Sequence, residues 1–209
     1  MNIPSSLWVK TFPLIPKIFR GARWKIDTSE KVLYLTFDDG PTPKVTHWVL
    51  EELEKRQAKA TFFCLGKNVQ AHPTIFNEIK EQGHSIGNHT FSHQNGWETS
   101  LKDYLNDAAE ADKYLNSKLF RPPYGKMTWR QYKALQQQYT LILWDVIAGD
   151  FLEEATGEWC FNNIKKHATA GSIVVLHDSE KCFETLKVCL PLIMDHFEER
   201  GYGFERLDG

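Results

Sequence analysis

Short apolar runs alternate with segments of helical spacing from about residue 30 to the end of this chain. The apolar runs, which have the length of strands, lie at residues 32–37, 60–65, 84–87, 118–120, 140–144, 172–176 and 203–207. Between them, apolar residues that recur every three or four positions predict helices after Pro43 and over residues 73–82, 100–117, 128–138, 157–169 and 183–199. Strands that alternate with helices favour a parallel sheet.

Seven strands, several of them apolar throughout, predict an α/β fold built as a deformed (β/α) barrel with seven or eight strands. In such barrels the chemistry lies at the carboxyl ends of the strands. The candidates are therefore the polar residues that follow the apolar runs, namely Asp38, Asp39, His89, Arg121, Asp145 or Asp150, His177 and Asp178. We expect their side chains to meet at one rim of the barrel.

Composition narrows the class of protein. A chain of 209 residues fits one domain, and its formal net charge of −2 offers no general attraction to nucleic acid, so we expect no nucleic-acid partner. The four cysteines contain no Cys-x-x-Cys pair and are interpreted as reduced thiols. No stretch reaches the roughly 20 apolar residues that cross a bilayer, so we expect no transmembrane segment.

Residues 1–30 precede the alternating pattern. Within residues 1–25, cations and aromatic residues are interleaved, and prolines interrupt the apolar positions. We interpret residues 1–30 as an arm that caps the barrel and residues 31–209 as the domain that holds the chemistry, because segments broken by proline form poor interfacial helices. Weak contact of residues 1–25 with a membrane surface is the alternative. The segment lacks the features of an export signal, so the predicted location is cytoplasmic or membrane-peripheral.

The segment Thr36-Phe-Asp-Asp-Gly-Pro41 places two adjacent carboxylates at the end of a predicted strand. Gly40 and Pro41 favour a turn, and a turn is the simpler explanation of this segment taken alone. Neighbouring side chains nevertheless point to different sides, so Asp38 and Asp39 can serve a water and a metal separately.

The segment Gly87-Asn-His-Thr-Phe-Ser-His93 contains two histidines four positions apart. If the segment is helical, His89 and His93 lie on one face and can converge on one ion, although surface helices also reach this spacing by accident. Together with a carboxylate, two imidazoles form a set with open positions for water and substrate. That set is typical of a catalytic zinc-like site.

Two further segments offer groups for acyl transfer. Arg121-Pro-Pro-Tyr124 is a stiff loop that can aim the Tyr124 N–H at a developing oxyanion, although a rigid surface turn has the same pattern. His177 ends the most apolar run; near a metal its unperturbed pKa suits a proton donor, and elsewhere it is a satisfied core residue. Among tryptophans that we otherwise expect in the core, Trp97 is the best candidate for a sugar platform.

Taken together and in this order, these segments resemble the NodB-homology polysaccharide deacetylases, carbohydrate esterase family four. The first three family motifs are present as Thr-Phe-Asp-Asp-Gly at residues 36–40, His-Thr-Phe-Ser-His at residues 89–93 and Arg-Pro-Pro-Tyr-Gly at residues 121–125. The resemblance covers roughly residues 31 to 207. It implies a NodB-like deformed barrel and one divalent metal ion, usually Zn²⁺, with Co²⁺ or Ni²⁺ as substitutes.

The resemblance also implies a role for each matching residue. By this resemblance Asp38 is the general base and Arg121 positions it, while the Tyr124 N–H is an oxyanion donor and His177 is the general acid. The residues that it assigns to the metal are Asp39, His89 and His93.

Two motifs depart from the family pattern. The fourth, commonly Asp-x-x-Asp-Trp, reads Ile147-Ala-Gly-Asp150-Phe151. Asp150 keeps the carboxylate that in the family interacts with the arginine or the catalytic histidine, while the wall that faces the sugar differs. The fifth, usually Leu-x-His, begins at Val175, which implies a slightly wider acyl pocket that accepts acetyl and leaves formyl open.

These features predict a metal-dependent hydrolase that removes N-acetyl groups from an N-acetylated sugar polymer or oligomer, like a chitin oligomer or peptidoglycan, and releases acetate. One alternative is an O-acetyl esterase that acts on acetylated polysaccharide. Another is a sugar deformylase or small-molecule amide hydrolase on the same fold. A non-catalytic carbohydrate-binding protein is the least favoured, because a complete set of convergent groups is the usual mark of a working site.

Overall fold

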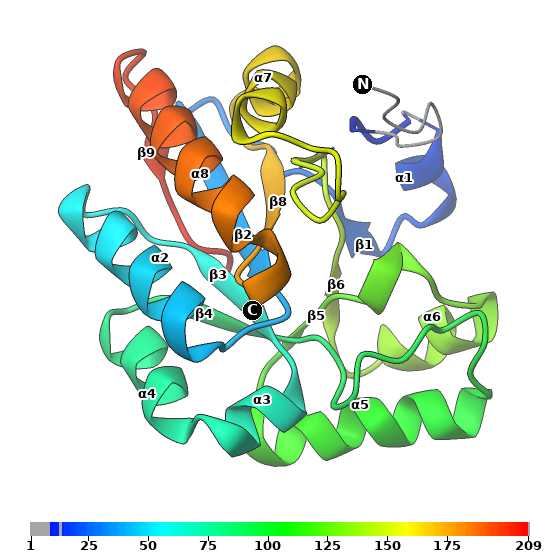
Figure 1. Cartoon of the computed structure of the whole chain (residues 1–209). Helices are drawn as coiled ribbons and strands as arrows, with labels where there is room; N and C mark the ends of the chain where they lie inside the picture. Colours follow the sequence, from blue (N-terminus) through cyan, green and yellow to red (C-terminus); the bar gives the residue numbers. More distant parts are fainter. Residues whose placement is uncertain (1–8, 13, 209) are drawn as a thin grey trace.

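One curled parallel sheet lies at the centre of the molecule, with helices around it (Figure 1). The computed structural model describes residues 9–12 and 14–208. The strands follow the order β1-β6-β5-β4-β3-β2-β8-β7, and β9 pairs with β2 outside this path. Their bounds are β1 (Ala22–Arg23), β2 (Val32–Asp38), β3 (Thr61–Cys64), β4 (Ser85–Asn88), β5 (Leu119–Phe120), β6 (Thr140–Ile142), β7 (Val146–Ile147), β8 (Ile173–His177) and β9 (Gly203–Phe204).

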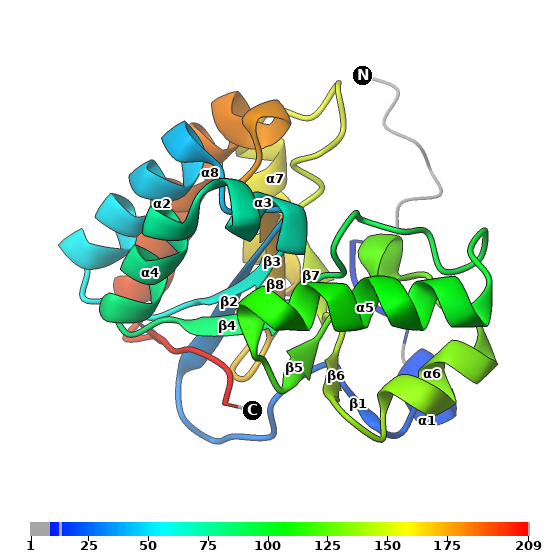
Figure 2. The same cartoon turned by 90° about the horizontal axis from the view of Figure 1, so that it is seen from below.

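The helices connect successive strands and cover the sheet. They are α1 (Ile15–Ile18), α2 (Pro43–Lys55), α3 (Gly66–Ala71), α4 (Pro73–Glu81), α5 (Leu101–Leu115), α6 (Trp129–Leu135), α7 (Gly157–His167) and α8 (Phe183–Glu198), with 3₁₀ turns η1 (Pro123–Gly125) and η2 (Glu180–Cys182). Seen from below, α5 runs lengthwise past the strands, with α3 near one end and α6 near the other (Figure 2).

The predicted fold class is confirmed. All seven predicted strands are present, and the main path of the sheet contains eight strands, all paired in parallel. The path ends at β1 and β7, so the sheet forms a curled half-barrel. The apolar pattern does not predict β1 and β7, which have two residues each.

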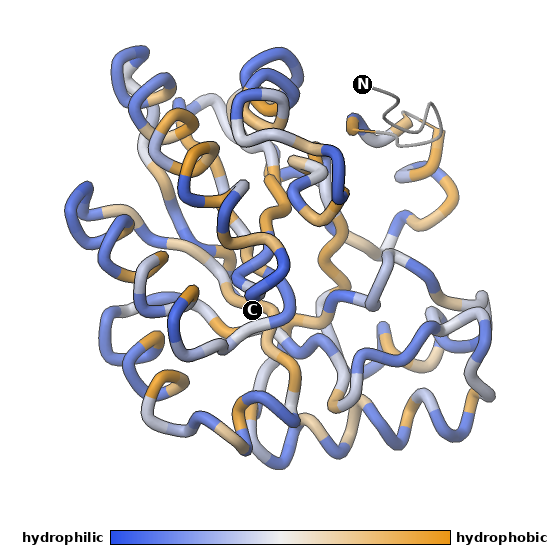
Figure 3. Tube along the Cα trace, in the orientation of Figure 1, coloured by the Kyte–Doolittle hydropathy of each residue, from blue (hydrophilic) through white to orange (hydrophobic). Residues whose placement is uncertain are grey.

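The core lies between the sheet and the helices. Leu35 and Phe37 of β2 have no exposed surface, and neither have Val45, Val49 and Leu53 of α2. These helical positions are four residues apart, so one stripe of α2 faces the strands, while Lys44, Glu51, Glu54 and Lys55 are exposed. Figure 3 shows hydrophobic colour along the central strands and hydrophilic colour on the outer turns of the helices.

The described part of the N-terminal arm is joined to the sheet. β1 adds to the edge of the sheet beside β6, and an isolated antiparallel bridge links Lys10 to Val146 of β7. Lys10 Nζ also lies 2.6 Å from Asp145 Oδ2. The proposed boundary at residue 30, the membrane contact of residues 1–25 and the cellular location stay predictions, and residues 1–8 lie outside the described residues. Among the described residues, no helix has the length and apolar character that crossing a membrane requires.

Two buried tyrosines allow a test of the packing. The Tyr104 hydroxyl is buried and has no hydrogen-bond partner among the described residues, whereas the Tyr132 hydroxyl accepts the Gly21 N–H at 2.9 Å. We expect Tyr104→Phe to raise the free energy of unfolding by about 1 kcal/mol and Tyr132→Phe to lower it by about 1 kcal/mol. Urea denaturation of both variants measures this, and a destabilised Tyr104→Phe protein would contradict the packing.

Candidate active site

The register of the sheet brings the predicted residues to one rim. Asp38 at the end of β2 is the direct partner of His177 at the end of β8. Farther along the sheet, Asn88 of β4 pairs with Phe120 of β5, so His89 and Arg121 follow neighbouring strands. Parallel strands end at the same edge, and this edge is therefore where all the predicted groups gather.

Asp39, His89 and His93 form a group that could hold a metal ion. One ligand atom from each residue lies within 4.8 Å of the others. Asp39 Oδ1 is 3.2 Å from His93 Nε2 and 3.8 Å from His89 Nε2. This convergence matches the ligand set that the sequence predicts.

A loop between β4 and α5, and not a helix, carries the two histidines. The assumption that residues 89–93 form a helix is wrong, because Thr90 and His93 have φ of 65° and 67°, in the left-handed region. A change of backbone hand at these residues turns His93 back toward His89. Their ring centroids are 5.2 Å apart.

Side-chain acceptors explain why the segment is not a helix. Asn88 Oδ1 accepts the Thr90 N–H at 2.8 Å, and Asp107 Oδ2 of α5 accepts the N–H groups of Phe91 and Ser92 at 2.8 and 3.0 Å. Local and cross-element bonds of this kind compete with helical pairing. The sequence reasoning missed both Asn88 and Asp107, since a helix-borne aspartate gives no signal of a partner lying 15 residues away.

The protonation states of the group suit a divalent cation. Burial alone would raise the pKa of Asp39, but contact with His93 and the positive charge of His177 outweigh it and hold that pKa well below its ordinary value. Burial lowers the pKa of His89 to about 4, against the pull of Asp38 and Asp39. The site therefore offers an ionised carboxylate and a neutral imidazole at neutral pH, which are the forms that bind metals.

Two further observations indicate that this group suits a divalent cation. His89 Nδ1 lies 2.8 Å from the Arg121 carbonyl oxygen, which fixes the proton on Nδ1 and leaves the Nε2 lone pair facing the group. Asp39 Oδ1 is buried and makes no well-directed hydrogen bond among the described residues. A buried acceptor without a partner is costly unless a cation satisfies it. Asp39, His89 and His93 thus fit a divalent metal.

The Asp38 carboxylate is held by a buried arginine. Arg121 Nη1 donates to Asp38 Oδ1 at 2.7 Å, and the Arg121 side chain has no exposed surface. The same Nη1 donates to Thr36 Oγ1 at 2.7 Å, and Nη2 donates to the Leu143 carbonyl at 3.0 Å. The guanidinium also lies 4.1 Å from the centroid of the Phe63 ring. The predicted pairing of arginine with the candidate base is present.

Asp150 pairs with His177 on the other side of the site. Asp150 Oδ1 lies 2.9 Å from His177 Nδ1, and Oδ2 accepts the His177 backbone N–H at 2.8 Å. Burial alone would lower the pKa of His177, but the charge and hydrogen bond of Asp150 raise it to about 9. His177 therefore carries a proton at neutral pH. Of the two partners left open for Asp150, the histidine is the one that it contacts.

Tyr124 belongs to the third motif and contacts the candidate metal group. Its φ is 60°, and the hydrogen bonds that close the surrounding turn are donated by the N–H groups of Gly125 and Lys126. The Tyr124 hydroxyl lies 3.1 Å from His93 Nδ1. This contact orients the His93 ring with Nε2 toward Asp39, a function that the sequence did not predict for the side chain.

Asp178 is a rim residue to which the sequence assigns no role. Its Oδ1 accepts the Gly40 N–H at 3.0 Å and its Oδ2 accepts the Thr46 hydroxyl at 2.6 Å. A Cβ at position 40 would lie 2.0 Å from Asp178 Oδ2, so the loop that follows Asp39 requires glycine. Burial raises the pKa of Asp178 to about 8. Asp178 thus anchors the loop that carries the candidate metal ligand Asp39.

The other candidates are distributed as follows. Asp145 bonds Lys10 and the Ser172 hydroxyl and does not belong to this group. The Phe151 ring packs edge-on against His177, with centroids 5.3 Å apart, in place of the family tryptophan. Ile147 and Val175 are buried. Trp97 is 66% exposed, so its placement suits a platform better than a core residue.

Comparison with known proteins decides the family. The model of the polysaccharide deacetylase family matches residues 25–141, which include the first three motifs. This chain belongs to the polysaccharide deacetylase family. As a member it is a hydrolase, and the family resemblance stated from the motifs is confirmed.

Individual members of the family match over most of the chain. A peptidoglycan-N-acetylglucosamine deacetylase from Bacillus cereus is 32% identical over 87% of this chain and 88% of its own length. A chitooligosaccharide deacetylase from Azorhizobium caulinodans is 33% identical over 76% of this chain and 79% of its own. The crystal structure of a peptidoglycan N-acetylglucosamine deacetylase with 4-naphthalen-1-yl-N-oxidanyl-benzamide superimposes with a TM-score of 0.87 at 28% identity, over 94% of this chain and 95% of that one.

If Asp38 is the base and Asp39, His89 and His93 bind the metal, substitutions at these residues should separate the loss of metal from the loss of turnover. His89→Ala should fold and hold little metal, because one of three ligands is gone; Asp39→Asn should also lose metal. Asp38→Asn should keep the metal and lose roughly 10²–10⁴ in rate, because only the base is removed. Elemental analysis, acetate release and circular dichroism measure the three properties. His167→Ala, which lies outside the group, is the control, and equal metal loss in Asp38→Asn and Asp39→Asn would contradict the assignment.

The His177–Asp150 pair predicts the basic limb of the pH profile. A group that donates a proton loses its function as the pH rises through its pKa, so kcat/KM of this deacetylase should fall near pH 9. Asp150→Asn removes the charge that raises this pKa, so its basic limb should move to lower pH. Asp145→Asn is the control and should leave the limb in place. A shifted acidic limb with an unchanged basic limb would mean that Asp150 acts on Arg121 instead.

Proposed function

We propose that this chain hydrolyses the acetamide of an N-acetylated sugar in a polymer or oligomer, with Asp38 as the base and His177 as the acid. The observation that carries the proposal is that the candidate metal ligands Asp39, His89 and His93 share one rim with two candidate proton-transfer groups that have oppositely charged partners. Asp38 is paired with Arg121 and His177 with Asp150. A carboxylate beside a cation and an imidazole beside an anion are different environments, and such a difference assigns one group as the base and the other as the acid.

Each residue has a definite task in this proposal. Asp38, held in place by Arg121, accepts a proton from the attacking water. The Tyr124 N–H donates to the oxyanion that develops on the acetyl carbonyl. His177, protonated at neutral pH, donates its proton to the leaving nitrogen, so acetate and a free amino sugar are the products.

The metal that we propose is zinc. Two imidazoles and one carboxylate are a ligand set of catalytic Zn²⁺ sites, and the same donors also accept Co²⁺ or Ni²⁺. When bound, such an ion supplies Lewis acidity and makes a water more acidic. Asp39, His89 and His93 would hold it, with Arg121 and Tyr124 orienting the two rings through their contacts with Nδ1.

The substrate class follows from the relatives and from the acid. Relatives named for peptidoglycan N-acetylglucosamine and for chitooligosaccharide support an N-acetylated sugar as the substrate. An O-acetyl esterase on the same site is the second candidate. An amine leaves far more slowly than an alkoxide without a proton, so a histidine held protonated by Asp150 favours the amide. The full set of groups disfavours a non-catalytic binding protein.

Acetate release from two kinds of substrate tests the proposal. The zinc-loaded protein should release acetate from N-acetylglucosamine oligomers or peptidoglycan in preference to acetylxylan. His177→Ala should lose about 10²-fold or more on the amide and much less on an activated acetate ester, because only the amide needs the proton. His167→Ala is the control. Equal losses on both substrates would mean that His177 is not the acid, and activity on acetylxylan alone would favour the esterase.

A further inference from the structure

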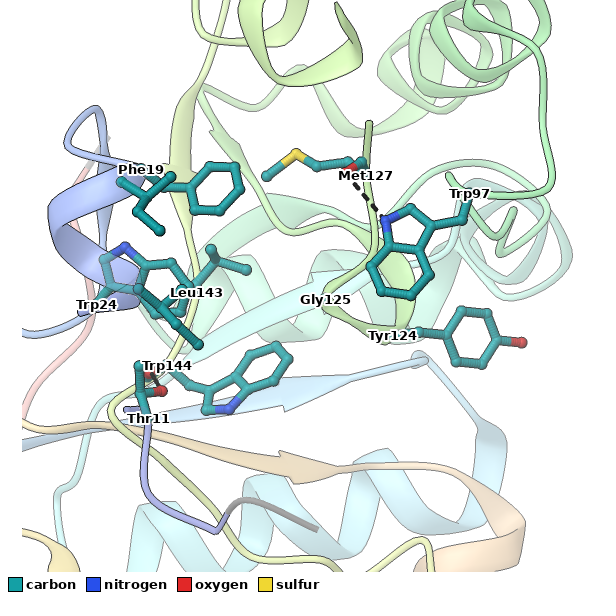
Figure 4. A pocket seen from close by; sticks show the side chains of 11 residues that line it. Thr11, Phe19, Trp24, Trp97, Tyr124, Gly125, Met127, Leu143 and Trp144 are labelled. Atoms are coloured by element: carbon teal, nitrogen blue, oxygen red, sulfur yellow. Dashed lines mark hydrogen bonds between the residues drawn. The ribbon is translucent and has the colours of Figure 1, made fainter. Parts of the chain in front are cut away.

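An aromatic pocket lies between the N-terminal arm and the third motif. Its volume is about 340 Å³. Phe19, Trp24 and Leu143 lie at one end, and Tyr124 and Trp97 lie at the other (Figure 4). Neither the proposed chemistry nor the family motifs account for the part that the arm builds.

The pocket adjoins the proposed active site. Tyr124 and Gly125 are in its wall, and the Tyr124 hydroxyl on the far side contacts the metal ligand His93. Gly125 has φ of 67°, and a Cβ there would lie 2.5 Å from the Trp144 ring, so the indole packs directly on the backbone of the motif. One side chain therefore separates the pocket from the reacting centre.

The polar atoms in the wall are largely occupied. The Thr11 hydroxyl donates to the Trp144 carbonyl, and Trp97 Nε1 donates to the Met127 carbonyl at 3.2 Å. Trp24 Nε1 is buried and finds no acceptor among the described residues. A sugar ring placed here would lose the hydrogen bonds of several hydroxyls to water, whereas a hydrocarbon group would lose none.

The mouth of the pocket leaves large apolar side chains in water. Ile18 of the arm is 62% exposed, and Trp97 is 66% exposed. Both line the pocket, although one comes from α1 and the other from the loop after His93. An apolar ligand would remove both from water at once, which favours its binding.

We propose that this pocket binds a hydrocarbon aglycone carried by the N-acetylated sugar. The proposal rests on the function proposed above, because the sugar must place its acetamide at the metal group while its aglycone extends past Tyr124. The substrate is then an amphiphile, with a polar end at the rim of the sheet and an apolar end under the N-terminal arm.

Matched glycosides test this substrate class. Octyl and methyl β-N-acetylglucosaminides, below the micelle concentration, are compared by acetate release and by calorimetric binding to the zinc-loaded chain. The octyl glycoside should have a KM lower by about tenfold, because several buried methylenes each favour binding. Ile18→Asp should reduce that preference at least about threefold, because a carboxylate at the mouth loses water when the chain enters. Activity on the methyl glycoside should not change.

Leu14→Asp is the matched control. Leu14 lies on the same arm, is 54% exposed and does not line the pocket, so its substitution should leave the octyl preference intact. Equal KM and equal binding for the two glycosides, or a preference for a chitin disaccharide over the octyl glycoside, would overturn the inference. If neither glycoside releases acetate, the proposed function fails, and calorimetry alone then decides whether the octyl chain binds.

Discussion

The Arg121 guanidinium bears a full charge in the interior, and the rim of the sheet is arranged around it. Asp38 and Thr36 of β2, together with the Leu143 carbonyl after β6, accept its hydrogen bonds, while Phe63 of β3 covers one face. The backbone carbonyl oxygen of Arg121 fixes the tautomer of His89. Leaving a buried charge without its partner costs about 3–5 kcal/mol, so these strands and the Asp38 carboxylate must come together as one unit.

The same constraint separates the two halves of the chemistry. β2 and β8 are adjacent and in register, so Asp38 and His177 would share one environment if their partners were alike. Arg121 reaches Asp38 from the β5 side, and Asp150 reaches His177 from the loop after β7. A cation on one side and an anion on the other allow neighbouring strands to present the proposed base and the proposed acid. The pairing of β2 with β8 fixes the distance between Asp38 and His177, and the segments that carry Arg121 and Asp150 give the two groups different charged partners.

Contiguous motifs were predictable, and contacts between distant segments were not. Asp38, Asp39, Arg121 and His177 each directly follow an apolar run, so strand geometry alone places them at the rim. The loop at His93 could not be predicted in this way, because its shape depends on a hydrogen bond to Asp107 of α5. The apolar stripe of that helix predicts which residues are buried and does not predict the partners of its polar residues. Asp178 likewise acts through Gly40, 138 positions away. Such pairs appear only when the fold brings them together.

Left-handed backbone angles are concentrated at this site. Among the described residues, six that are not glycine adopt them: Asp39, Gln57, Thr90, His93, Asn116 and Tyr124. Each such residue lowers the stability of the fold by roughly 1–2 kcal/mol. Four of them, Asp39, Thr90, His93 and Tyr124, lie at the candidate site, so the geometry of the site is maintained at the expense of stability. A thermostabilised variant selected without regard to turnover would tend to relax those four. Gln57 and Asn116 follow α2 and α5, where glycine is the preferred residue, and strain can be removed there without cost to the chemistry.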